Sequence, residues 1–227
     1  METLVTKKVS VVLWPILKHM EIEIKERILV KSAELFLRYG IRSITMDEIA
    51  VQMGVSKKTI YQFFADKDDL VADVVEKLIT HNEEECSQCT IRAENAIHEI
   101  FIALNELEEI LKGMNPLIMY DLEKHHPKSF QRFKDFKYRF LYQVIKANLE
   151  KGMEQGLYRE GLNVDVVTKH RIETAFMGFN QDVFPHNRYK ISEVGRELGM
   201  LFLHGIANEK GRKLIEKYLK EGQKKKL

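Results

Sequence analysis

The chain has little cysteine, little proline and no long apolar run. With two cysteines in 227 residues it cannot build a disulfide framework, and it fits a reducing compartment. Its apolar runs stop short of the roughly 18 residues that a membrane span needs, so no membrane partner is expected. Four prolines and twelve glycines, with abundant Leu, Ile, Glu, Lys and Met, favour helices over strands. We therefore predict an all-α protein of one or two domains.

A strong excess of either charge is also missing. The formal net charge is +2, and from Glu209 to Leu227 eight Lys or Arg stand against three Glu, which leaves −3 for residues 1–208. We therefore do not expect a basic protein that coats nucleic acid over its whole surface. Any contact with nucleic acid must be made by a local surface of complementary shape. The chain closes with a short basic tail at 223–227.

Residues 1–20 are predicted to be an N-terminal extension. Their "KKVSVVLWPIL" imitates a signal peptide, because Lys7 and Lys8 precede a short apolar run. A small-residue cleavage site is missing and Lys18 and His19 follow, so we expect a cytoplasmic protein rather than a secreted one. Whether Met20 is the natural start stays open.

From Glu21 the apolar residues recur with a helical period. Gly40 then supplies a left-handed residue that ends the first helix. In the next helix Thr45 and Glu48 form the pattern of a capping box, and Gly54 ends that helix. The apolar residues of the first helix that keep near-helical spacing are Ile24, Ile28, Leu35, Phe36 and Tyr39. In the second helix Ile49, Ala50 and Met53 are expected to face inward.

A short connection of Gly54 to Ser56 leads to a third helix, predicted from Lys57 to Phe64 with Ser56 as its cap. A capped helix, a three-residue turn and a second capped helix are typical of a helix-turn-helix. Asp66 is placed to cap a longer helix that follows. We expect a helix-turn-helix DNA-binding domain at 21–66 and a helical ligand-binding and dimerisation domain at 67–222. Further helices are expected near 91–112, 116–125, 127–155, 164–181, 192–208 and 210–221.

The third helix has a polar side without acids. Ile60, Phe63 and Phe64 suit the core, which leaves a basic, aromatic and amide face. Such a face suits DNA, because lysine contacts phosphates or guanine, glutamine reads adenine and a tyrosine hydroxyl reaches phosphate. The set left exposed is Lys57, Lys58, Tyr61 and Gln62.

The stretch "ILVKSAELFLRYGIRSITMDEIAVQMGVSKKTIYQFFADKDDLV" resembles the N-terminal domain of the TetR-type family of bacterial transcriptional regulators. The resemblance implies that Thr45 anchors a phosphate and that Lys67 holds the DNA backbone. Lys58 departs from the small residue that many relatives have there, so the resemblance does not supply the operator sequence. The residues implied to lie in or beside the major groove are Ser56, Lys57, Lys58, Thr59, Tyr61 and Gln62.

One recognition helix reads few base pairs, so helix-turn-helix proteins usually dimerise on palindromic double-stranded DNA. The family pairs its last two main helices, which here correspond to 164–181 and 192–208. Gly178, Gly199 and Gly205 would let backbones approach closely. The predicted homodimer interface consists of Ile172, Phe176, Phe179, Leu198, Leu201, Phe202 and Gly205.

The resemblance further implies a small-molecule inducer, bound in the helices between the DNA-binding domain and the dimer interface. The function that follows is a repressor released from its operator by that inducer, although activation stays open. No cofactor and no metal are expected. The residues predicted to line the pocket are Phe101, Asn105, Tyr120, Tyr142, Phe176 and Asn180.

Other readings of the chain remain. Cys86 and Cys89 form a CxxC pair, which would suit a redox- or metal-responsive regulator, although a structural zinc needs four ligands. Glu123 and His126 form one Glu-x-x-His motif, whereas a helical di-iron enzyme needs two. We therefore predict that the protein is not an enzyme, and keep a helical scaffold protein as a further alternative.

Overall fold

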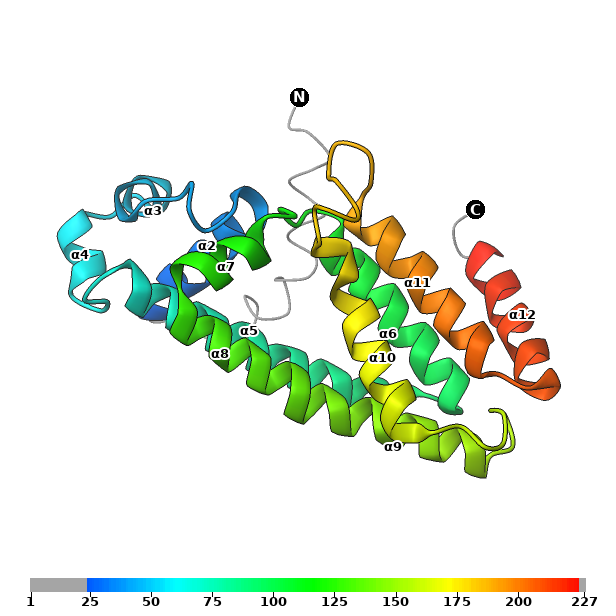
Figure 1. Cartoon of the computed structure of the whole chain (residues 1–227). Coiled ribbons are helices and arrows are strands. Elements are labelled where there is room, and N and C mark those ends of the chain that lie inside the picture. Colours follow the sequence, from blue (N-terminus) through cyan, green and yellow to red (C-terminus); the bar gives the residue numbers. More distant parts are fainter. Residues whose placement is uncertain (1–23, 225–227) are drawn as a thin grey trace. The chain divides into compact units, whose positions relative to one another are not determined.

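The computed structural model describes residues 24–224, which fold into helices (Figure 1). Within this range no β-strand forms, and one isolated bridge joins Tyr158 to Ala207. The all-α prediction is confirmed. The extension at 1–20 and residues 225–227 of the tail lie outside the described residues. The helices are α2 (Ile24–Tyr39), α3 (Met46–Met53), α4 (Lys57–Tyr61), α5 (Lys67–Arg92), α6 (Ala96–Leu111), α7 (Ile118–His125), α8 (Pro127–Asp135), a π-helical turn (Phe136–Phe140), α9 (Leu141–Glu154), α10 (Val164–Phe176), a 3-10 turn (Met177–Phe179), α11 (Ile191–Ile206) and α12 (Glu209–Lys224).

The helix predicted near 91–112 begins later than expected. The preceding helix α5 continues to Arg92, and Asn95 then caps α6. Its Oδ1 accepts hydrogen bonds from the backbone N–H of Ile97 at 3.1 Å and of His98 at 2.9 Å. Among helices α2 to α12 none is long and apolar enough to cross a bilayer.

The helix predicted at 127–155 runs from Pro127 to Glu154, but it changes its winding in the middle. At the π-helical turn the N–H of Leu141 donates to the carbonyl of Phe136, five residues back. A π-turn adds one residue to the helix and so rotates every later side chain about the axis. A single 3.6-residue period therefore cannot describe the whole segment.

The chain divides into two compact units. One contains 24–81 and 109–134, and the other contains 82–108 and 135–224. The first unit is larger than the predicted domain at 21–66, because the backbone after α2 is bonded to the later segment. Arg42 N–H donates to Asp121 Oδ2 at 3.0 Å, and Asn115 N–H donates to the Leu37 carbonyl at 2.6 Å. The functional boundaries at 66 and 67 stay a prediction.

The core of the first unit contains the apolar residues that the helical period selects. Ile28, Ile49, Ile60 and Phe64 are almost completely buried. Tyr39 keeps the helical spacing as the last residue of α2, but it is 47% exposed and its ring lies 5.2 Å from the Arg38 guanidinium carbon. A residue at the end of a helix is no longer held on the inward face by a following turn.

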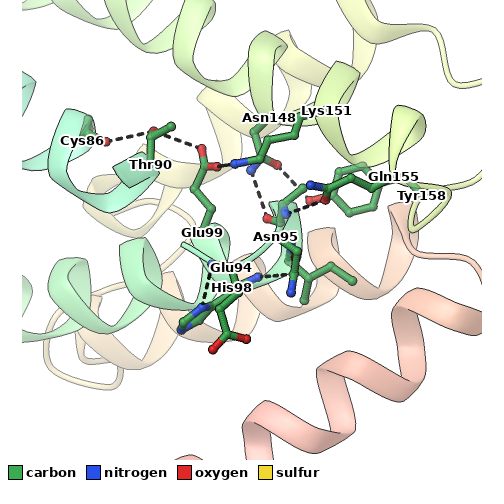
Figure 2. Close-up of polar contacts among 12 residues, drawn as sticks. Cys86, Thr90, Glu94, Asn95, His98, Glu99, Asn148, Lys151, Gln155 and Tyr158 are labelled. Atoms are coloured by element: carbon green, nitrogen blue, oxygen red, sulfur yellow. Dashed lines mark hydrogen bonds and ion pairs between the residues drawn. The ribbon is translucent and has the colours of Figure 1, made fainter. Parts of the chain in front are cut away.

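The second unit contains a buried polar network that joins α5, α6 and α9 (Figure 2). Glu99 lies in its middle and is buried. Its carboxylate accepts from Lys151 Nζ at 2.8 Å and from the Thr90 hydroxyl at 3.3 Å. A buried carboxylate is tolerated because both partners are supplied by neighbouring helices.

The same network continues to the loop after α9. Asn148 Nδ2 donates to the Ala96 carbonyl at 3.0 Å, and its Oδ1 accepts from the Tyr158 hydroxyl at 2.9 Å. The Tyr158 ring packs directly on Gly152, where an added Cβ would lie 2.0 Å from the ring. Only glycine fits at that position of α9.

Candidate nucleic-acid interface

Helix α3 begins and ends with the caps that its sequence predicts. The Glu48 N–H donates to Thr45 Oγ1 at 3.2 Å, and the Thr45 N–H donates to Glu48 Oε2 at 2.6 Å, which completes the capping box. At the other end Gly54 adopts φ 66°, and the Val55 N–H donates to the Ala50 carbonyl at 3.0 Å. These bonds fix the direction in which the chain leaves α3.

Helix α4 follows after the predicted turn. Ser56 caps it, since its Oγ accepts from the Thr59 N–H at 3.1 Å. The helix is shorter than predicted and ends at Tyr61, with Phe64 three residues beyond its end. Ile60 and Phe64 are nonetheless buried and Phe63 is half-buried, so the apolar side of this stretch is anchored as expected.

The predicted polar face of α4 is exposed. Lys57, Lys58, Tyr61 and Gln62 are accessible together with Ser56, whereas Thr59 is half-buried. Lys57 is not free, because its Nζ lies 2.8 Å from Asp47 Oδ1 on α3 and 5.8 Å from the centre of the Tyr61 ring. The hydrogen bond to Asp47 raises the pKa of Lys57, so its ammonium stays charged. This face therefore offers side chains that can donate hydrogen bonds to phosphate, and one of them, Lys57, already has a carboxylate partner.

Lys67 differs from the lysines of α4. Its Nζ donates to the Ile41 carbonyl at 2.6 Å and lies 5.9 Å from the centre of the Phe36 ring. Burial lowers its pKa. The ammonium therefore ties the start of α5 to the turn after α2. Its other donors remain for a DNA phosphate, and that role stays a prediction.

The acids next to this surface are bonded elsewhere. Glu26 accepts from Lys77 Nζ at 2.6 Å, and Asp69 accepts from the Ala65 N–H at 3.0 Å. Asp68 Oδ1 lies 2.7 Å from Nδ1 of His126, but burial lowers the pKa of this histidine, so the contact does not neutralise the carboxylate. As predicted, Asp66 accepts from the Asp69 N–H at 2.9 Å and caps α5. Of these carboxylates, Glu26 has a cationic partner that offsets its repulsion of phosphate.

The exposed face of α4 thus stands on a capped helix and a fixed turn, and the sequence comparisons bear on the same residues. A profile described as "Bacterial regulatory proteins, tetR family" matches residues 28–74. The HTH-type transcriptional regulator YvaF of Bacillus subtilis is 29% identical over 102 residues, which cover 44% of this chain and 53% of YvaF. Residues 28–74 belong to the tetR family.

Relatives of this family also match over longer stretches. The HTH-type transcriptional repressor KstR2 of Mycobacterium tuberculosis is 23% identical over 183 residues, covering 78% of this chain and 90% of KstR2. The solved structure of FadR from Bacillus subtilis in complex with stearoyl-CoA matches with a TM-score of 0.62 and 18% identity, over 79% of this chain and 98% of FadR. At that identity the structural match shows the fold. The relatives are transcriptional regulators, in agreement with the prediction that this tetR-family chain is not an enzyme.

The residues predicted to line an inducer pocket lie in separate surroundings. Phe101 is buried with its ring centre 5.5 Å from that of Tyr218, and Tyr142 donates to Asp165 at 2.8 Å. Tyr120 is 51% exposed and belongs to the first unit, whereas the other five belong to the second. Asn105 and Asn180 are exposed and Phe176 is half-buried. The assignment of these six residues to one pocket stays a prediction.

The predicted dimer residues divide into three groups by burial. Ile172 and Phe202 are buried within their own protomer, because they face inward on α10 and α11, and so they are not available at a surface. Gly199 also packs internally, against Leu104 of α6. Leu201 is 71% exposed, and nothing lies within 4 Å of an added Cβ at Gly205. Those that are half-buried are Phe176, Phe179 and Leu198.

The two cysteines lie in an environment that suppresses the thiolate. Burial, followed by the Glu106 carboxylate, raises the pKa of Cys86 to about 11 and that of Cys89 to about 12. The Cys89 thiol donates to Glu106 Oε2 at 2.8 Å. Thiolates are the nucleophiles and metal ligands, so this environment disfavours the redox- or metal-responsive alternative. Across 24–224 no group of three or more His, Cys, Asp and Glu is placed to hold a metal ion.

One residue of the candidate interface was missed from the sequence. Asp47 is exposed on α3 and holds Lys57 of α4, ten residues later. The sequence does place this acid in the first turn of α3. Acids are common there because they stabilise the start of a helix, so the position alone did not indicate a role in the interface. Only the angle between α3 and α4 shows that this carboxylate faces the DNA-reading lysines.

Proposed function

We propose that this tetR-family regulator acts as a homodimer that binds a palindromic operator in double-stranded DNA and is released by a small-molecule inducer. The observation that carries the proposal is the exposed face of Lys58, Tyr61 and Gln62 on a helix whose direction is fixed by two caps and a turn. That combination suits insertion into the major groove. DNA binding of this kind takes place in the bacterial cytoplasm.

The homodimer is supported by the outer side of α11. Leu198, Leu201 and Gly205 follow one another at the spacing of a single helix face, and Leu201 is largely exposed. An exposed apolar stripe with an open glycine suits close packing against a second copy. Two recognition helices would then be placed about one groove turn apart, roughly 34 Å.

Ligand release is supported by analogy with relatives. The structure of the B. subtilis FadR contains stearoyl-CoA, and a regulator of the same fold from Saccharomonospora viridis contains choline. An inducer acts only if it binds the conformation that does not fit the operator better than the one that does. The chemistry of the inducer does not follow from these relatives.

The test is a DNA-binding titration with the full chain. Fluorescence anisotropy is measured on the intergenic DNA upstream of the gene and on a scrambled duplex of equal length, at salt concentrations between about 50 and 200 mM. We expect tighter binding to the intergenic DNA and a steep decrease with salt. Equal affinity for both duplexes, or affinity independent of salt, would refute the proposal.

The dimer is tested separately by sedimentation velocity. Leu201→Asp should give monomers and weaken operator binding, because a carboxylate cannot be buried against a second copy. Ile91→Asp is the matched control, since Ile91 is 74% exposed on α5 outside the proposed face. If both variants stay dimeric, the dimer does not use this side of α11.

A further inference from the structure

Helix α10 carries two buried polar groups that have no hydrogen-bond partner within residues 24–224. One is the Oγ1 of Thr168, whose residue is fully buried, and the other is Nη1 of Arg171. They stand three residues apart and therefore on neighbouring positions of one helix face. A guanidinium and a hydroxyl are both donors, so their common complement is an acceptor.

The surroundings of Arg171 are apolar. Its guanidinium carbon lies 5.4 Å from the centre of the Phe202 ring, and Phe202 belongs to the core cluster of this unit. Val167, one turn earlier on α10, and Met200 on α11 pack against the same cluster. Burial lowers the pKa of Arg171 to about 10, so the side chain is still charged at neutral pH.

The acids of α10 do not neutralise this charge. Asp165 accepts from Lys169 Nζ at 2.8 Å and from the Tyr142 hydroxyl. Glu173 accepts from Lys137 Nζ at 3.0 Å and from the Tyr138 hydroxyl. Both carboxylates are exposed and are occupied by these partners. A buried cation without a counterion is unfavourable, so an anion that reached it would be bound favourably.

We propose that Arg171 and Thr168 bind the carboxylate of the inducer, which is an apolar monocarboxylic acid whose body packs beside Phe202. The guanidinium fork matches the two carboxylate oxygens, and the Thr168 hydroxyl donates a further bond. A single buried positive charge fits a monoanion, because a dianion would leave one negative charge unpaired. This inference rests on the proposed function, in that it names the chemical class of the inducer.

A second copy of the chain is a poorer partner for these two groups than a small molecule is. Nη1 is buried inside one protomer, whereas the proposed dimer face uses exposed residues such as Leu201. A side chain of a partner that docks on the outside does not reach the interior of the helix pair.

The experiment is calorimetric titration of the full chain with a panel of apolar monocarboxylates, led by decanoate, together with decanamide as an uncharged isostere. We expect binding of at least one acid and none of its amide. Arg171→Met should weaken binding of that acid by about 10- to 100-fold, the usual value of a charge-assisted hydrogen bond. Thr168→Val, which keeps the shape, should weaken it to a smaller extent. Lys169→Met is the matched control, because it removes an exposed positive charge from the same helix and should leave affinity unchanged.

A second readout does not depend on the ligand. Without any acid present, Arg171→Met should raise the melting temperature, because it replaces an unpaired buried charge by an apolar side chain. A lower melting temperature would mean that the guanidinium already has a partner in the free protein, and would overturn the proposal. So would a panel without a single binder, or an acid that binds Arg171→Met as tightly as the unchanged chain.

The outcome of this experiment can be distinguished from the outcome of the test of the proposed function. Calorimetry of the acid needs no DNA, and operator binding is measured on the same Arg171→Met sample without acid. Unchanged operator binding together with lost acid binding supports both proposals. Operator binding that is absent in the unchanged chain rejects the regulator function, whereas acid binding that does not depend on Arg171 rejects only this inference. If Arg171→Met dissociates into monomers in sedimentation velocity, Arg171 serves the second copy and the inference is rejected.

Discussion

The helix-turn-helix and the second compact unit hold their polar groups in different ways. In the helix-turn-helix the decisive bonds are local: Thr45 with Glu48, and Ser56 with Thr59, each three residues apart. In the second unit they join distant parts of the chain, as Glu99 with Lys151 and Asn95 with Tyr218, which are 52 and 123 residues apart. Local bonds can be lost singly at a limited cost. A buried network that joins several helices loses its packing as a whole.

The largest expected effect tests the second unit. Gly152→Ala places a methyl group against the Tyr158 ring, which is buried and bonded to Asn148, so neither side can yield. We expect a loss of about 3 kcal/mol in the free energy of unfolding, measured by urea denaturation. Glu150→Ala, exposed on the same helix, is the control and should change stability little. If the free energy of unfolding decreased by less than the loss of a single helix cap would cause, the buried network would not be held together more tightly than the local bonds of the helix-turn-helix.

The next effect concerns recognition. Lys58→Ala should cost about 1–3 kcal/mol in operator binding and relax the preference at one base pair, since Lys58 is an exposed residue on the reading face. Anisotropy with operators changed at single positions measures it. An equal loss on every sequence would show that Lys58 contacts phosphate and is not a reader.

Lys67→Ala provides the opposite behaviour within the same unit. It should weaken binding to all sequences alike and reduce the salt slope by about one. Because its Nζ also holds the Ile41 carbonyl, the free energy of unfolding should decrease by about 1 kcal/mol. A variant with unchanged stability would mean that the bond to Ile41 contributes nothing, and would leave Lys67 with a DNA role alone.

A smaller effect tests the local bonds directly. Thr45→Ala removes the α3 cap and should cost about 1 kcal/mol of stability, whereas Thr45→Ser keeps the hydroxyl and most of that free energy. Thermal unfolding of both variants distinguishes the cap from the lost methyl group. Equal losses in the two would contradict the capping account.

The smallest functional effect is expected at the cysteines. Because the pKa of Cys86 is raised from 9.0 to about 11, its thiolate fraction and its alkylation rate near pH 8 should be about 100-fold below those of a free thiol. The rate should recover as the pH approaches 11. Replacing Cys86 and Cys89 by serine should leave operator affinity unchanged with and without oxidant. Rapid alkylation near pH 8 would reopen the redox-responsive alternative.

The same contrast explains what could be predicted from the sequence. The caps at Thr45, Ser56 and Asp66 and the turn at Gly54 depend on neighbouring residues, so the sequence pattern was sufficient. The burial of Ile172 and Phe202 was missed, because helical spacing alone does not distinguish an inward face from a dimer face. Arg171 Nη1 has no partner because of where the folded helices place the surrounding groups, and the spacing of residues in the sequence cannot predict this.

The ion pair between Asp47 and Lys57 has a consequence for the search along the chromosome. On the proposed role of Lys57 in DNA binding, any duplex, whatever its sequence, would compete with Asp47 for the Lys57 ammonium, and this competition would weaken non-specific and specific complexes by the same factor. Sequence preference is unaffected, but the residence time on wrong sites is shorter. Asp47→Asn should therefore give a regulator that binds DNA more tightly and finds its operator more slowly among many competing sites.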